Sequence, residues 1–66
     1  MTLTVNGADR ALAETTTVAD VVRGLGGDPS GCAVAVNDEV VPRGDWSTVE
    51  LRDGDRVEVL TAVQGG

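Results

Sequence analysis

Alternating polar and apolar residues at the start of the chain predict a β-hairpin. Thr2–Val5 alternates in this way, as a strand with one buried face does. Asn6 and Gly7 follow, and this pair is typical of a type I′ turn because both central residues of that turn need a positive φ. A second strand over Asp9–Ala13 would complete the hairpin.

The pattern then changes to a helical period. Apolar residues recur at spacings of three and four and would form one face of a helix: Val18, Val21, Val22 and Leu25. Thr17 can cap this helix, and Asp20 three residues later approaches the capping-box pattern. Gly26 and Gly27 would end the helix, and Pro29 prevents its continuation.

The middle of the chain predicts a second pair of strands. Cys32–Val36 is too short for a free-standing helix and rich in valine, so we expect a buried strand there. Asn37–Glu39 would turn the chain into a short return strand, Val40–Val41, which Pro42 ends. In the loop that follows, we expect Trp46 to anchor a turn.

The last predicted strand, Arg56–Val63, has two different faces. It follows the turn Asp53–Asp55, and Val57 and Val59 would point into the core. Because strand side chains alternate, a second set would point outward: Arg56, Glu58, Leu60 and Ala62. This outward face becomes apolar toward its end, which indicates a docking surface at Leu60, Ala62 and Glu58. The alternative is that the loop around Trp46 covers Leu60.

The predicted order is strand-strand-helix-strand-strand-strand. This order predicts an α+β fold of the ubiquitin-like β-grasp type, with a mixed sheet of four to five strands packed on one main helix. Parallel pairing of the first and last strands fits it. With no internal repeat or linker, we expect residues 1–66 to form a single domain.

The composition limits the chemistry that this chain can perform by itself. It has no histidine and no lysine, so it lacks the commonest general acid–base, a Ser-His-Asp triad and a lysine Schiff base. One cysteine without histidine cannot build a structural zinc site or an internal disulfide. We therefore expect no enzyme activity, no catalytic residue, no bound metal and no bound cofactor.

The formal net charge of −6 argues against two classes of partner. Nucleic-acid phosphates and anionic lipid surfaces repel an acidic chain, and a single aromatic residue, Trp46, is no stacking platform for bases. The longest apolar run, Cys32–Val36, has five residues, whereas a membrane span needs about 20. We expect a cytoplasmic protein that binds neither nucleic acid nor membrane, since the N-terminal residues do not resemble a signal peptide.

The final residues Gln64, Gly65 and Gly66 are the most informative candidate site. They could be a frayed end. They could also be a flexible tail, residues 64–66, in which Gly66 carries a reactive carboxylate and its two predecessors give access to it. To be activated as an acyl-adenylate, this carboxylate must be threaded into the active site of another protein. Glycine has no side chain to obstruct its entry or the attack on it.

Three other features have simpler interpretations. Gly24–Gly27 suggests a phosphate loop, but these glycines lie at the predicted helix C-terminus, where the dipole repels anions. Cys32 has no histidine or lysine in the chain to activate it, so we expect a buried core thiol rather than a sulfur relay. Asp53 and Asp55 lie too close together for an EF-hand, which spreads its ligands over about 12 residues, so we expect solvated turn residues.

Three segments carry a family resemblance: Val41–Trp46 (VPRGDW), Asp53–Glu58 (DGDRVE) and Val63–Gly66 (VQGG). Together with the length and element order, they resemble the ThiS family, the sulfur carriers of thiamine biosynthesis. The chain departs from the family where Gly44 stands for a frequent serine and Leu60 for a frequent aromatic residue.

The resemblance implies that a ThiF-type adenylating enzyme uses ATP to form an acyl-adenylate at Gly66. A cysteine desulfurase or another persulfide donor would then supply the sulfur of a C-terminal thiocarboxylate. The thiazole synthase ThiG would take that sulfur for the thiazole ring. The protein would be a protein-borne sulfur donor on which its partner enzymes act.

Two other functions stay open. The DGD turn and the final glycines are shared with MoaD, so the chain could be a small subunit of molybdopterin synthase or serve another sulfur pathway. It could also be a β-grasp binding module or protein modifier without sulfur chemistry.

Overall fold

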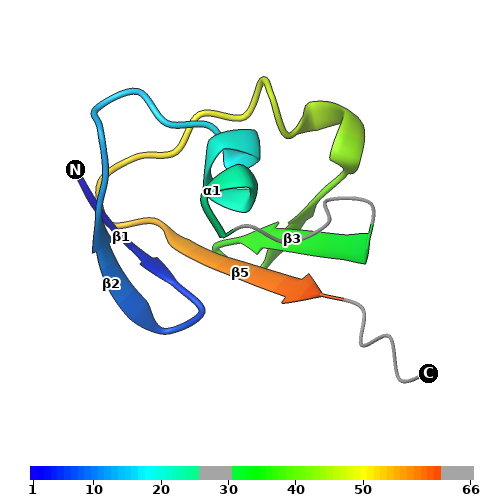
Figure 1. Ribbon diagram of the computed structural model, residues 1–66, viewed down its shortest axis with the longest axis horizontal. Helices are drawn as coiled ribbons and strands as arrows, with labels where there is room; N and C mark the ends of the chain where they lie inside the picture. The colour runs from blue at the N-terminus through cyan, green and yellow to red at the C-terminus, as the bar shows by residue number, and fades with distance from the viewer. Residues whose placement is uncertain (26–30, 62–66) are drawn as a thin grey trace.

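The computed structural model describes residues 1–25 and 31–61, with five strands, an α-helix and a 3-10 helix in these parts of the chain. Figure 1 shows the helix α1 lying across one face of the sheet. The elements are β1 Thr2–Val5, β2 Ala8–Ala11, α1 Val18–Leu25, β3 Cys32–Val36, β4 Glu39–Val41, η2 Arg43–Asp45 and β5 Arg56–Thr61. The strand order in the sheet is β2-β1-β5-β3-β4. The predicted α+β class, element order and mixed sheet are confirmed.

β5 is the central strand of this sheet. It pairs in parallel with β1, where Val5 lies opposite Val57, and in antiparallel with β3, where Val34 lies opposite Val59. The parallel pairing of the first and last strands, predicted from the element order, is therefore confirmed.

The first hairpin forms as its turn residues predict. Asn6 and Gly7 have φ values of 51° and 83°, as a type I′ turn requires. β2 begins at Ala8 and ends at Ala11, two residues before the predicted end. Beyond β2, the Leu12 N–H donates to the Met1 carbonyl at 2.8 Å, which keeps the chain beside β1.

The core lies between α1 and the covered face of the sheet. The buried apolar residues of the described chain come from the strands, the helix and the loop after β4: Leu3, Val5, Val18, Val21, Val22, Val34, Trp46, Leu51, Val57 and Val59. Of the four residues predicted to form the apolar face of the helix, only Leu25 is not buried, with 38% of its surface exposed.

Trp46 anchors the loop after β4, as predicted. Its indole N–H donates to the Val41 carbonyl at 3.0 Å, and its own carbonyl accepts the Ala19 N–H of α1 at 3.0 Å. The ring is buried, and the Arg43 guanidinium carbon lies 5.6 Å from its centroid. This loop therefore fixes the helix to the β4 side of the sheet.

The predicted capping box is also present. The Asp20 N–H donates to the Thr17 hydroxyl oxygen at 3.2 Å, and the Thr17 N–H donates to the Asp20 carboxylate at 3.1 Å. The bond from the Thr17 backbone N–H is the main cause that holds the pKa of Asp20 below its ordinary value. Asp20 also pairs with Arg23 at 3.2 Å. The predicted helix stop at Gly26–Pro29 lies outside the described residues.

Candidate functional site

The candidate site starts from the outward side of β5, the strand that leads toward the tail. Val57 and Val59 are buried, whereas Glu58 is exposed and Leu60 has 72% of its surface exposed. The predicted alternation along this strand is therefore confirmed. The alternative, in which the loop around Trp46 covers Leu60, is wrong because that ring packs in the core on the other side of the sheet.

Leu60 belongs to an apolar patch that spans three strands. Ala33 of β3 pairs with Leu60, Ala35 pairs with Glu58, and Val40 of β4 pairs with Ala35. Because paired residues share a face of the sheet, all these side chains point away from α1. We call this set the open face: Ala33, Ala35, Val40, Glu58 and Leu60.

The open face is hollowed and carries two large exposed aliphatic side chains. It lines a shallow depression of about 250 Å³, and Val40 has 74% of its surface exposed. Exposed apolar side chains grouped around a hollow are typical of a surface that another protein covers.

Sequence reasoning missed Val40, Ala33 and Ala35 in this patch. The predicted strand over Cys32–Val36 is present, but it is less buried than expected, because only Val34 is fully buried there. The sequence did contain a signal for this patch. Alanine and valine alternate along the strand, which puts Ala33 and Ala35 on one face and Val34 and Val36 on the other.

Charged residues surround the apolar patch unevenly. Arg56 pairs with Asp38, whereas Glu58 forms no ion pair in the described part of the chain. The Glu58 carboxylate at the edge of the patch is therefore not compensated by a cation in the described part of the chain.

The Asn6 carboxamide holds β5 beyond the end of β1. The pairing of the two strands ends at Val5 and Val57, and the Asn6 backbone N–H donates to the Val57 carbonyl at 2.9 Å. The Asn6 Oδ1 accepts the Val59 N–H at 2.8 Å, and its Nδ2 donates to the Val59 carbonyl at 3.2 Å. The Asn6 side chain therefore makes the backbone hydrogen bonds to Val59 that a neighbouring strand would otherwise make, just before Leu60.

Asn37 does the same on the other edge of β5. Its Oδ1 accepts the Arg56 N–H at 3.0 Å, and its backbone N–H donates to the Arg56 carbonyl at 2.8 Å. Its Nδ2 donates to the Asp55 carboxylate at 3.1 Å. The two asparagines thus hold β5 from both sides.

Replacing Asn6→Gly should loosen the end of β5 without changing the turn. Glycine keeps the positive φ but removes both bonds to Val59, which should lower the free energy of unfolding by about 1–2 kcal/mol. Urea unfolding measures that loss, and amide hydrogen exchange at Val59 should accelerate more than exchange at Val34. An unchanged exchange rate at Val59 would show that the carboxamide does not hold the strand.

Cys32 is less buried than predicted. The expected core thiol is half-buried, and it packs against the edge of the core on the same face of β3 as Val34. It lies opposite Thr61, at the end of the register between β3 and β5. The prediction of a buried core thiol was wrong, because Cys32 is the first residue of β3 and packs only against the rim of the core.

Cys32→Ser should fold and, under the function that the family resemblance implies, should still accept sulfur at Gly66. A hydroxyl at a half-buried strand position should cost about 1 kcal/mol of unfolding free energy. Thermal unfolding measures the cost, and intact-protein mass spectrometry after reaction with the partner enzymes measures the sulfur. A folded variant that takes up none would show that the thiol relays sulfur.

The acidic turn residues act as hydrogen-bond acceptors. The Asp53 Oδ1 accepts the Thr2 N–H at 2.7 Å, and the Asp55 Oδ2 accepts the Arg52 N–H at 2.8 Å.

Among the described residues, no group of three or more His, Cys, Asp and Glu side chains is placed to hold a metal ion. No helix within the described ranges is long and apolar enough to cross a membrane. Gly24 lies in the last turn of α1, at the end of the dipole that repels anions.

The remaining predicted site residues lie outside the described residues. These are the tail residues Gln64, Gly65 and Gly66, together with the docking residue Ala62. The structure therefore brings together Leu60 and Glu58 of the predicted site and adds Val40, Ala33 and Ala35.

Comparison with known proteins gives consistent results. Residues 3–66 match the model of the ThiS family. The chain is 32% identical over 50 residues to the sulfur carrier protein ThiS of Escherichia coli, covering 76% of each chain. A crystal structure of the thiamine biosynthesis protein (ThiS) from Geobacter metallireducens superposes with a TM-score of 0.84 at 33% identity, over the full length of both chains.

A longer protein also aligns with the whole chain. The thiazole synthase of Paramagnetospirillum magneticum is 35% identical over all 66 residues. The chain spans only 20% of the length of that enzyme, so the larger part of the enzyme has no counterpart in it.

Proposed function

The chain belongs to the ThiS family, and from this premise we propose that it is a sulfur carrier of thiamine biosynthesis whose Gly66 carboxylate takes up and delivers sulfur. The match of residues 3–66 to the family is the observation that carries the proposal. The Escherichia coli relative, a sulfur carrier protein, and the Geobacter metallireducens structure support it.

The first step activates the carboxylate. A ThiF-type adenylating enzyme binds the tail and ATP, and a carboxylate oxygen of Gly66 attacks the α-phosphorus of ATP. Pyrophosphate leaves, and Gly66 becomes an acyl-adenylate. ATP is a substrate of the partner enzyme, so the carrier itself needs no bound cofactor.

The second step exchanges oxygen for sulfur. The terminal sulfur of a persulfide, on a cysteine desulfurase or another donor, attacks the acyl carbon of Gly66, and AMP leaves. A thiol then reduces the resulting acyl disulfide, which leaves a thiocarboxylate on Gly66 and oxidises the thiol and the donor cysteine to a disulfide. When the sulfur passes to the thiazole ring, an oxygen atom from water or from the thiazole precursor replaces it on the acyl carbon, and the carboxylate returns.

These steps assign no acid–base work to the carrier. The chain has no histidine and no lysine, and the partner enzymes supply the residues that activate ATP, the persulfide and the thiazole precursor. This division of labour supports a protein-borne sulfur donor over an enzyme.

The open face is the surface by which the partner enzymes hold the carrier. Leu60 and Val40 are the apolar anchors, and Glu58 offers a carboxylate to a cationic group on the partner. Ala62 would extend the same surface toward Gln64 and Gly65, which thread Gly66 into the active site. Because β5 is central to the sheet, its outward face is a rigid platform for this tail.

A thiazole synthase of the ThiG type is the proposed acceptor of the sulfur. In Paramagnetospirillum magneticum, a segment similar to this whole chain is part of a thiazole synthase polypeptide. A carrier and an enzyme in one polypeptide meet at high effective concentration, which favours direct transfer between them.

Reconstitution with a purified adenylating enzyme tests the proposal. With ATP, the mixture should exchange labelled pyrophosphate into ATP only when the carrier is present. With a persulfide donor and a thiol, the intact mass should rise by the difference between one sulfur and one oxygen atom, and fragmentation should place the change on Gly66. A mass change on Cys32 alone would reject the proposal.

A further inference from the structure

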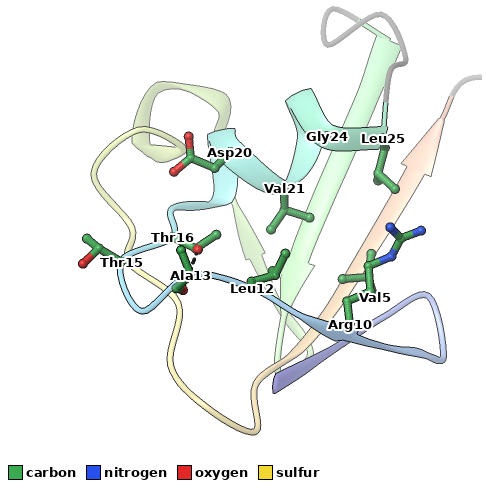
Figure 2. Close-up of a pocket in the computed structure, with 10 residues that line it drawn as sticks. All are labelled: Val5, Arg10, Leu12, Ala13, Thr15, Thr16, Asp20, Val21, Gly24 and Leu25. Atoms are coloured by element: carbon green, nitrogen blue, oxygen red, sulfur yellow. Dashed lines mark hydrogen bonds between the residues drawn. The ribbon is translucent and has the colours of Figure 1, made fainter. Parts of the chain in front are cut away.

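A groove lies between α1 and the edge strand β2, on the helix side of the sheet (Figure 2). Its volume is about 300 Å³. Figure 2 shows Leu12 and Val21 pointing toward one another in its middle. The Arg10 guanidinium lies on the side of Leu25, and Asp20 lies at the opposite end.

The groove exists because α1 does not reach across β2. Arg10 pairs with Leu3, and Ala8 pairs with Val5, so the side chains of Arg10 and Ala8 point to the helix side of the sheet. Leu3 and Val5 are buried beneath the helix, whereas Ala8 and Arg10 are exposed. β2 is also the last strand at its side of the sheet, so its outer edge faces no other strand of the described chain.

A glycine in the helix keeps the groove open. Gly24 lies within α1 and lines the groove, and its φ is not in the left-handed region. A Cβ built at this position meets nothing within 4 Å, so packing does not require glycine either. Glycine is a poor helix former, and a longer side chain here would project into the groove. The residue therefore weakens the helix and preserves an accessible apolar surface.

The charges at the groove are complementary to a particular kind of segment. Arg23 and Arg56 pair with carboxylates, whereas Arg10 forms no ion pair with any described residue. A cation with no ion-pair partner among the described residues, beside exposed apolar surface, favours an acidic group next to an apolar one. This preference for an acidic group holds only at Arg10, because the chain as a whole carries a negative net charge.

We infer that this groove is a second binding site, for an extended segment of a partner protein that carries a large apolar side chain next to an acidic one. The segment adds to the open edge of β2, where backbone hydrogen bonds hold it. Its apolar side chain lies over Leu12 and Val21 beside Gly24, and its carboxylate pairs with Arg10. The groove and the open face lie on opposite sides of the sheet, so this partner can bind while the open face is covered.

Capped pentapeptides are suitable probes. Each has a glutamate beside a leucine, a methionine or a phenylalanine, with threonines at the other positions. Titrated into the ¹⁵N-labelled protein, at least one should shift the amide signals of Ala8–Leu12 and Val21–Leu25 and leave those of Val40 and Leu60 unchanged. A matched peptide with glutamine for glutamate should bind several-fold more weakly.

Two pairs of variants separate the groove from the rest of the surface. Gly24→Met fills the groove and should weaken binding more than about tenfold without lowering the melting temperature. Its control is Gly44→Met, at another position where a Cβ meets nothing within 4 Å. Arg10→Gln should weaken binding roughly threefold to fivefold, whereas Arg52→Gln should not.

Four results would overturn the inference. The first is the absence of shifts at the groove with every peptide at millimolar concentration. The second is a set of shifts confined to the open face. The third is binding that survives in folded Gly24→Met, and the fourth is an equal loss in Gly44→Met.

Discussion

Deleting Gly66, or adding one residue after it, should abolish sulfur transfer and leave the free energy of unfolding unchanged. The proposed chemistry needs a terminal glycine carboxylate in the partner's active site, and a shifted or blocked carboxylate misses the attacking geometry. The buried apolar residues of the described chain all precede Leu60, and a glycine has no side chain to contribute to the core. Thiazole formation and thermal unfolding are measured on the same preparations.

Gly66→Ala is the matched variant for this test. It keeps the chain length and the carboxylate and adds only a methyl group, so it should retain measurable adenylation where the truncated and extended proteins have none. Full sulfur transfer by the truncated or the extended protein would contradict the assignment of Gly66.

Substitution by aspartate should have different effects on the two faces of β5: loss of the fold on the buried face and loss of docking on the exposed face. Val59→Asp places an unpaired charge at a position that is 5% exposed, which costs several kcal/mol. A chain of 66 residues has a total stability of only about 3–10 kcal/mol, so this variant should be largely unfolded. Circular dichroism and urea unfolding measure the loss.

Leu60→Asp should instead fold and fail to dock. Leu60 is 72% exposed, and burial of a leucine contributes about 1.5–3 kcal/mol, so adenylation should weaken by about ten- to a hundredfold. The effect should appear mainly as a higher KM for the carrier in pyrophosphate exchange. Arg52→Asp is the control for an added charge elsewhere on the surface. An unfolded Leu60→Asp protein beside a folded Val59→Asp protein would reverse the assignment of the two faces.

Features set by neighbouring residues were predictable from the sequence. Asn6 and Gly7 form the expected turn because a positive φ is a property of those two residues, and Thr17 and Asp20 form the cap because both partners lie within one helical turn. The exposure of Leu60 also followed, because side chains alternate strictly along a strand.

Features set by strand register were not predictable in the same way. The open face joins Val40, Ala35 and Leu60, and only the pairing of three strands brings them together. An apolar run such as Cys32–Val36 does not reveal whether one or both of its faces are covered. The two hydrogen bonds between the Asn6 side chain and the Val59 backbone join residues 53 positions apart, which no local pattern indicates.

The groove beside Gly24 illustrates the same limit. The sequence places this glycine near the C-terminus of the predicted helix, where it suggests only a phosphate loop, an interpretation that the helix dipole argues against. That it lines a groove together with Leu12 and Arg10 depends on how far the short helix reaches across the sheet.

The central claim is that sulfur passes through Gly66 to the thiazole, and a heavy sulfur isotope tests it most directly. The carrier is first converted to its thiocarboxylate with labelled sulfur, purified, and then mixed with thiazole synthase and its other substrates in the presence of unlabelled sulfide. The account predicts that the thiazole contains the heavy isotope and that the carrier returns to the mass of its carboxylate form in equal amount. Thiazole that contains only unlabelled sulfur, beside a carrier that keeps its label, would contradict it.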